Sequence, residues 1–174
     1  MANVLLVIDM LRGFLEPQGA LYCGDESRSI IPKISQLLQR EAANGSHVVF
    51  VCDNHEPNDP EFEMFAPHCV AGTQEAEIIP ELASLSGLVV PKYTFSAFVG
   101  TRLDETLREL QPDRTIICGV CTSICVLFTV YDVRLRGYQV DVYADCVADF
   151  DPEAHGFSLR HMQKVLGARL LELD

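Results

Sequence analysis

Residues 114–137 read RTIICGVCTSICVLFTVYDVRLRG, and this stretch contains the unit from which the fold is predicted. Its first six residues, 114–119, form a short apolar run that is typical of a strand buried on both faces. The segment that follows, residues 122–137, is nearly all apolar at its start, which indicates a central and heavily buried helix. A strand followed at once by a helix is the repeating unit of parallel α/β folds.

The same alternation recurs along the whole chain. Further short apolar runs that predict strands are NVLLVI (3–8), HVVFVC (47–52), GLVV (87–90), YQVDVY (138–143) and ARLLEL (168–173). Apolar spacing between them predicts helices over residues 30–45, 101–110 and 152–167. The expected fold is therefore α/β: a three-layer, doubly wound structure with a mostly parallel six-stranded sheet and helices on both faces.

Length and composition narrow the class of protein. With 174 residues, 48% hydrophobic and 22% charged, residues 1–174 are expected to form a single globular domain. The net charge of −12, from 13 basic and 25 acidic residues, argues against a nucleic-acid or anionic-membrane partner. The N-terminal apolar run is too short to span a bilayer and lacks the flanks of a signal peptide, so a cytoplasmic location is expected.

The cysteines predict reduced thiols. An odd number of cysteines scattered through apolar stretches fits a reduced core better than a disulfide scaffold. They are Cys23, Cys52, Cys69, Cys118, Cys121, Cys125 and Cys146.

Chemically useful side chains follow four of the predicted strands. In open parallel sheets, ligands bind outside the carboxyl ends of the strands, at the switch point of the strand order. The residues at these ends are Asp9, then Asp53 with His55, then Lys92, and finally Cys121 with Cys125. We expect these side chains to share one rim of the sheet.

Cys125 is the candidate nucleophile. Thr122 is expected to cap the following helix, so that Cys125 lies near its third position, where the helix dipole and free N–H groups favour a thiolate. The same N–H groups suit an oxyanion hole. Asp9 then takes the thiol proton and later returns it to a leaving amine, while Lys92 holds the charges together. The alternative for Cys125 is a buried cysteine with only a structural role. The alternative for Asp9 and Lys92 is that each is simply solvated at the rim of the sheet.

Three further residues suggest a metal site. Asp53 and His55 are two apart, so an extended chain directs both side chains to the same side. His68 is the obvious third ligand, and an Asp/His/His set with open positions suits a catalytic or ligand-binding metal. Alternatively, both histidines are loop residues that bond to backbone. His47, His155 and His161 lie away from this rim and are assigned no role.

Five motifs together resemble the isochorismatase-like cysteine hydrolase superfamily, and within it the nicotinamidase/pyrazinamidase branch. The motifs are LLVIDMLRGF (5–14), CDNHEP (52–57), MFAPHCVAGT (64–73), PKYTFSAFVGT (91–101) and GVCTSICV (119–126). The resemblance implies an isochorismatase-like, Rossmann-like fold and a catalytic triad of Asp9, Lys92 and Cys125. It also implies a cis peptide between Val120 and Cys121, with the N–H groups of Cys121 and Cys125 forming the oxyanion hole.

The resemblance further implies a divalent metal ion, zinc first and iron or manganese as alternatives, held by Asp53, His55 and His68. Asp59 and Glu61 are candidates for an additional ligand. The substrate-binding residues that it implies are Phe14, Phe65, Val120 and Cys121. This chain departs from the usual motifs at Asn54, at Ala66, and at Phe65, where many members have tryptophan.

The function expected from this resemblance is metal-dependent deamidation of nicotinamide to nicotinate and ammonia through a thioester on Cys125. Family members are usually homo-oligomers, dimers or tetramers, so the same is expected here. The alternatives are a superfamily hydrolase acting on ureido, N-carbamoyl or other small amides, and a non-enzymatic α/β binding domain. Cleavage of the vinyl ether of isochorismate is less expected, because that chemistry needs no nucleophilic thiol.

Overall fold

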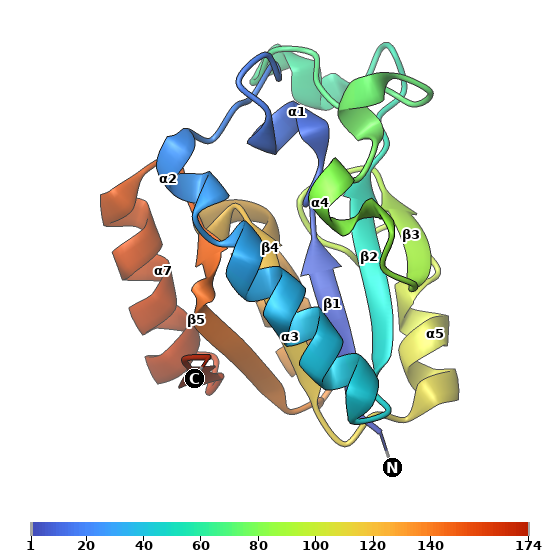
Figure 1. The fold of residues 1–174 in the computed structure, drawn as a ribbon, viewed down its shortest axis with the longest axis vertical. Coiled ribbons are helices and arrows are strands. Elements are labelled where there is room, and N and C mark those ends of the chain that lie inside the picture. Colours follow the sequence, from blue (N-terminus) through green and yellow to red (C-terminus); the bar gives the residue numbers. More distant parts are fainter. Residues whose placement is uncertain (1, 174) are drawn as a thin grey trace.

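The structure, a computed structural model that describes residues 2–173, is built on one six-stranded sheet (Figure 1). The strand order is β3-β2-β1-β4-β5-β6, and every pairing is parallel. The strands are β1 (Val4–Ile8), β2 (His47–Asp53), β3 (Leu88–Lys92), β4 (Thr115–Val120), β5 (Val140–Ala148) and β6 (Arg169–Leu171). This confirms the predicted fold class, and it places the switch point between β1 and β4.

Helices cover both faces of the sheet. They are α1 (Arg12–Leu15), α2 (Asp25–Arg28), α3 (Ile31–Ala43), α4 (Pro80–Ala83), α5 (Leu103–Leu110), α6 (Leu127–Leu135) and α7 (Pro152–Lys164). Leu5 and Val7 of β1 pack into the core beneath α3, which crosses the near face in Figure 1. Leu6 and Ile8 point the other way, into the core formed with α5, α6 and α7. Alternate residues of one buried strand thus supply both cores, as expected for a central parallel strand.

The predicted helix over residues 122–137 begins differently from expectation. It opens with a π-helical turn, Thr122–Val126, and α6 follows from Leu127. Cys121 is the N-cap and its own side chain makes no capping bond, so the prediction of Thr122 as the cap is wrong. The Thr122 hydroxyl instead contacts Nδ1 of His155 on α7, at 2.9 Å. This bond links the turn to α7, and it gives His155 a structural contact that the sequence did not indicate.

Two strands end at least two residues later than the sequence predicted, whereas β2 and β4 end one residue later. β5 continues to Ala148, and its pairing with β4 shifts between Ile117 and Gly119. β3 continues through Pro91 to Lys92.

The irregular stretch between β2 and β3 contains the short 3₁₀ turns Pro60–Glu63 and Gln74–Ala76. It lies beside α1 at the carboxyl end of the sheet (Figure 1).

Among residues 2–173, no helix is both long enough and apolar enough to cross a bilayer.

Candidate active site

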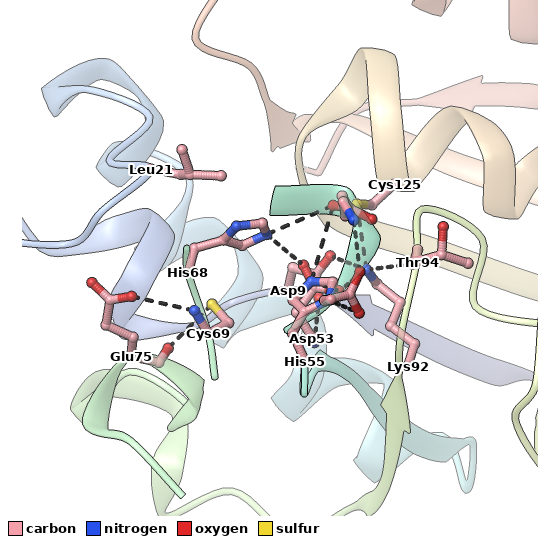
Figure 2. A network of polar contacts seen from close by, with 12 residues as sticks. Asp9, Leu21, Asp53, His55, His68, Cys69, Glu75, Lys92, Thr94 and Cys125 are labelled. Carbon is pink, nitrogen blue, oxygen red and sulfur yellow. Dashed lines mark hydrogen bonds and ion pairs between the residues drawn. The ribbon is translucent and has the colours of Figure 1, made fainter. Parts of the chain in front are cut away.

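Asp9, Lys92 and Cys125 meet at the carboxyl end of the sheet (Figure 2). Asp9 directly follows β1, Lys92 ends β3, and Cys125 lies in the turn after β4. Lys92 Nζ is 2.9 Å from Asp9 Oδ2 and 3.4 Å from Cys125 Sγ. Asp9 and Lys92 are fully buried, so they are not simply solvated rim residues. The structure therefore brings the predicted triad together, and the catalytic roles stay a prediction.

Close approach of β1 and β4 fixes this arrangement. Gly119 has a φ of 117°, and a Cβ at this position would lie 2.0 Å from the carbonyl oxygen of Ile8. Only glycine fits there, because it tolerates this φ and has no side chain. The peptide between Val120 and Cys121 that follows is cis, as the resemblance implied. The close approach at Gly119 sets the turn containing Cys125 beside the end of β1, where Asp9 lies.

Burial and neighbouring charges give Asp9 and Lys92 different protonation. Burial, aided by the negative charge of Asp53, raises the pKa of Asp9 to about 7, although Lys92 opposes the shift. Burial disfavours the charge of Lys92, but Asp53 and Asp9 together raise its pKa well above the usual value. Lys92 is therefore an ammonium at neutral pH, whereas Asp9 can gain or lose a proton there.

The thiol of Cys125 does not behave as the sequence suggested. Burial raises its pKa well above the usual value; the Lys92 charge opposes the shift, but Asp9 and Asp53 add to it. The expectation of a resting thiolate is therefore wrong, because complete burial and the two nearby carboxylates favour the protonated thiol. A carboxylate oxygen of Asp9 lies within 4.8 Å of this sulfur. The arrangement is a protonated thiol facing a carboxylate that can accept its proton.

Asp53, His55 and His68 form a second cluster beside the first. Their ligand atoms all lie within 4.8 Å of one another, and all three side chains are buried. Nε2 of His55 is 3.5 Å from Asp53 Oδ1, and Nε2 of His68 is 3.8 Å from Asp53 Oδ2. The opposite nitrogens are fixed, because Nδ1 of His55 bonds to Asp59 and Nδ1 of His68 bonds to the Ala66 carbonyl. Both Nε2 atoms are thus presented to one point.

The chemistry of this donor set fits a divalent metal ion. His55 Nε2 is buried and has no hydrogen-bond partner, which is unfavourable for a polar atom unless a ligand completes it. The carboxylate of Asp59 behind His55 matches the support that metal-binding histidines usually receive. Two imidazoles and a carboxylate suit zinc and also iron or manganese.

Glu61 joins this cluster, whereas Asp59 stands behind it. Glu61 Oε1 is 3.7 Å from His68 Nε2 and 4.0 Å from His55 Nε2. Asp59 Oδ2 instead contacts the far side of the His55 ring at 3.0 Å. Of the two candidates for an additional ligand, the geometry therefore favours Glu61.

A cavity of about 370 Å³ opens onto both clusters. Phe14, Phe65 and Cys121 line it, as the resemblance implied for substrate-binding residues. The side chain of Val120 does not line it, because this side chain is fully buried in the hydrophobic core. Sequence reasoning missed several further lining residues, although two of them lie within the quoted motifs: Leu21, Tyr22, Cys23, Phe95, Ile124 and Phe150.

Asp149 was also missed, although a signal for it existed. Its Oδ2 accepts the N–H of Ser123 at 2.7 Å and so holds the turn that contains Cys125. Asp149 directly follows β5, which makes it another residue at a strand end. Had the strand been predicted to extend beyond residue 143, this carboxylate would have been placed at the same rim.

Several solved structures are similar to this chain. A crystal structure of nicotinamidase PncA from Bacillus subtilis is similar, with a TM-score of 0.93 and 35% identity over 99% of this chain and 100% of that chain. A pyrazinamidase of Pyrococcus horikoshii in complex with zinc has a TM-score of 0.91 and 31% identity, covering 99% and 100%. N-carbamoylsarcosine amidase from Thermoplasma acidophilum has a TM-score of 0.89 and 30% identity, covering 99% and 96%.

The family model described as Isochorismatase domain matches residues 3–172, which is nearly the whole chain. The chain therefore belongs to the isochorismatase family.

Proposed function

We propose that the protein is a cysteine amidohydrolase that cleaves a small carboxamide through a thioester on Cys125. Family membership and neighbours that include a nicotinamidase and a pyrazinamidase indicate an amide-cleaving hydrolase. The observation that carries the proposal is the contact of one buried ammonium, Lys92, with both Asp9 and Cys125 in the wall of a cavity.

The first half of the reaction forms the thioester. Asp9 takes the proton of Cys125 as the sulfur attacks the carbonyl carbon, and Lys92 stabilises the negative charge that passes between them. A pKa of about 7 suits Asp9 for this proton transfer at neutral pH. The backbone N–H groups of Cys121 and Cys125 donate to the oxygen of the tetrahedral intermediate. Protonated Asp9 then gives its proton to the nitrogen that leaves as ammonia.

The second half releases the acid. Asp9, now a carboxylate again, takes a proton from a water molecule that attacks the thioester carbon. Collapse of this second tetrahedral intermediate breaks the carbon–sulfur bond, and Asp9 returns the proton to the sulfur. The products are a free carboxylic acid and the original thiol.

Nicotinamide is the proposed substrate. The rings of Phe14 and Phe65 both contact the His68 ring edge to face, with centroid distances to His68 of 5.6 and 6.4 Å. Aromatic rings thus lie beside the proposed metal ligands within the cavity. Asp53, His55, His68 and Glu61 would hold a divalent ion, zinc first and iron or manganese as alternatives. When bound, this ion supplies a Lewis-acid site for the ring nitrogen of a pyridine carboxamide. The metal is proposed to serve substrate binding more than bond cleavage.

Release of ammonia from nicotinamide by Cys125→Ala protein tests the nucleophile. We expect a loss of at least about 10⁴-fold in turnover, because no other group replaces the covalent step. Cys146→Ala is the matched control, since it removes a buried thiol that does not line the cavity. Near-normal turnover by Cys125→Ala would exclude covalent catalysis.

The metal proposal is tested by Glu61→Gln and by chelation. We expect Glu61→Gln to weaken zinc binding by about 10- to 100-fold, measured by competition with a chromophoric chelator and independently of activity. Chelated wild-type protein should show a raised KM for nicotinamide. Unchanged nicotinamide affinity after complete chelation would contradict the role in binding.

A second candidate substrate class is an N-carbamoyl or ureido compound. The similarity to N-carbamoylsarcosine amidase favours it. Turnover of a panel of small amides, measured with and without metal, separates the two candidate substrate classes. Turnover of an N-carbamoyl compound that is faster than that of nicotinamide and independent of metal supports the second candidate. A non-enzymatic domain would hydrolyse none of these compounds, with or without metal. The cytoplasmic location and the homo-oligomer remain part of the proposal, and sedimentation of the purified chain tests the latter.

A further inference from the structure

Two cysteines other than Cys125 meet in the wall of the cavity. The sulfur atoms of Cys23 and Cys121 are 3.3 Å apart, and both side chains line the cavity. Cys23 lies in the segment between α1 and α2, whereas Cys121 is the N-cap of the turn that contains Cys125. Both cysteines are free thiols. We propose that Cys23 and Cys121 form a dithiol which hydrogen peroxide converts to a disulfide, and that this bond slows the enzyme.

The backbone on both sides of the pair is held in place. The N–H of Cys23 donates to the Phe14 carbonyl, and its own carbonyl accepts the Ser27 hydroxyl, both at 2.9 Å. The carbonyl of Cys121 accepts the N–H groups of Ile124 and Val126, both at 3.1 Å. A disulfide has a sulfur–sulfur distance of about 2.05 Å, so the two sulfurs must approach by little more than about 1 Å. The pair is thus already close to bonding distance.

The oxidation is balanced with peroxide as the oxidant. The sulfur of one cysteine attacks an oxygen of hydrogen peroxide, which breaks the oxygen–oxygen bond and leaves a sulfenic acid and water. The second sulfur displaces the hydroxyl group of the sulfenic acid, which leaves as a second water. Two thiols are oxidised by two electrons in total, and one peroxide is reduced. The cavity gives a small oxidant access to both sulfurs.

The effect on turnover rests on the proposed function. The N–H of Cys121 is one of the two proposed oxyanion donors, and a disulfide would draw this residue toward Cys23. Displacement of a positioning group by about 1 Å can reduce a rate by about 100-fold. We therefore expect the disulfide form to turn over about 10- to 100-fold more slowly, and to recover when a dithiol reductant cleaves the bond.

The bond itself is tested in Cys125→Ala protein, which removes the nucleophile as a competing site of oxidation. The full chain is treated with hydrogen peroxide, digested without reductant and analysed by mass spectrometry. We expect a peptide pair that joins Cys23 to Cys121, with the loss of two hydrogen atoms, and its disappearance after reduction. Adding Cys23→Ser or Cys23→Ala should abolish it. Cys23 and Cys121 that both remain open to alkylation, or that oxidise separately without joining, would overturn the proposal.

The effect on activity is measured in protein that retains Cys125. Wild-type and Cys23→Ser proteins are each compared with their own untreated activity, so that oxidation of Cys125 is common to both. We expect the residual activity of the wild type, as a fraction of its untreated activity, to be at least about 10-fold lower than the corresponding fraction for Cys23→Ser. Reduction should bring the two fractions together. Equal fractional losses would overturn the effect on turnover. Absence of amidase activity in untreated wild type would instead refute the proposed function, and the joined peptide would still decide whether the dithiol forms.

Discussion

Two carboxylates buried at opposite ends of the sheet, Asp9 and Asp141, differ in how their oxygens are bonded. Asp141, near the amino end of β5, accepts two hydrogen bonds from Arg114 and two from Arg169. Asp9, at the carboxyl end of β1, shares one cation, Lys92, with Asp53. Its Oδ2 is in ion-pair contact with Lys92 at 2.9 Å but has no hydrogen bond of good geometry.

The difference in bonding decides the protonation of each carboxylate. Burial favours the neutral form of Asp141, but hydrogen bonds from Arg114 and Arg169 outweigh it and hold its pKa below the usual value. At Asp9, burial and the charge of Asp53 prevail and raise the pKa to about 7. Both residues are almost inaccessible to solvent, so burial alone does not distinguish them. A fully bonded buried carboxylate stabilises the fold, whereas an incompletely bonded one retains a proton equilibrium that a reaction can use.

Removing the cation should affect the carboxyl end of the sheet most strongly. Lys92→Met leaves Asp9 buried without its cation and leaves Asp53 with His55 alone, which should lower the free energy of unfolding by about 3 to 5 kcal/mol. It should also abolish measurable ammonia release. Urea denaturation of metal-free protein and an amidase assay measure the two effects.

Arg114→Met is the matched control at the other end. Asp141 keeps Arg169 in this variant, so the loss should be only about 1 kcal/mol, with turnover unchanged. Combining Lys92→Met with Asp9→Asn removes the carboxylate that has lost its cation and should restore part of the stability. Equal losses of free energy of unfolding in Lys92→Met and Arg114→Met would show that Asp9 and Asp141 do not differ in how completely they are bonded.

Neutralising each carboxylate should separate activity from stability. Asp9→Asn is expected to reduce turnover by about 10³-fold, because it removes the proton acceptor, while the free energy of unfolding stays the same or rises. Asp141→Asn is expected to leave turnover unchanged and to lower the free energy of unfolding by about 2 kcal/mol, because hydrogen bonds to a charged group are lost. A loss of stability in Asp9→Asn as large as that in Asp141→Asn would contradict the comparison.

The grouping of candidate catalytic residues at the carboxyl end of the sheet was largely predictable from the sequence. Asp9, Lys92 and Cys125 each follow an apolar run, and parallel strands bring their carboxyl ends to one rim, so position in the chain was sufficient to place them together. The protonation of Cys125 was not predictable in this way. A helix start is a local signal, but complete burial and two nearby carboxylates come from the assembled sheet.

The contacts of Asp141 at the amino end of the sheet could not be predicted from the sequence. Asp141 meets Arg114 and Arg169 because β5 lies between β4 and β6 in a particular register, which pairs Asp141 directly with Arg169. No spacing within the chain reveals that register. The same limit applies to the contact between Cys23 and Cys121, which joins a loop to a strand end.

The pH dependence of stability should have opposite signs for the two carboxylates in metal-free protein. The pKa of Asp9 is raised from 3.8 to about 7, so the folded state binds more protons than the unfolded state between these values, and stability falls as pH rises through this range. The pKa of Asp141 is lowered, so its contribution is complete above about pH 4 and is lost as pH falls further.

The variants make this difference measurable by urea denaturation of chelated protein at several pH values. Relative to wild type, Asp9→Asn should gain stability between about pH 4 and pH 7, because asparagine does not carry the charge that burial disfavours. Asp141→Asn should be destabilised throughout that range, and its deficit should shrink only below about pH 4, where wild-type Asp141 begins to bind a proton as well. Parallel pH profiles for the two variants would show that Asp9 is bonded as completely as Asp141, and the distinction between a structural and a reactive buried carboxylate would then not hold in this protein.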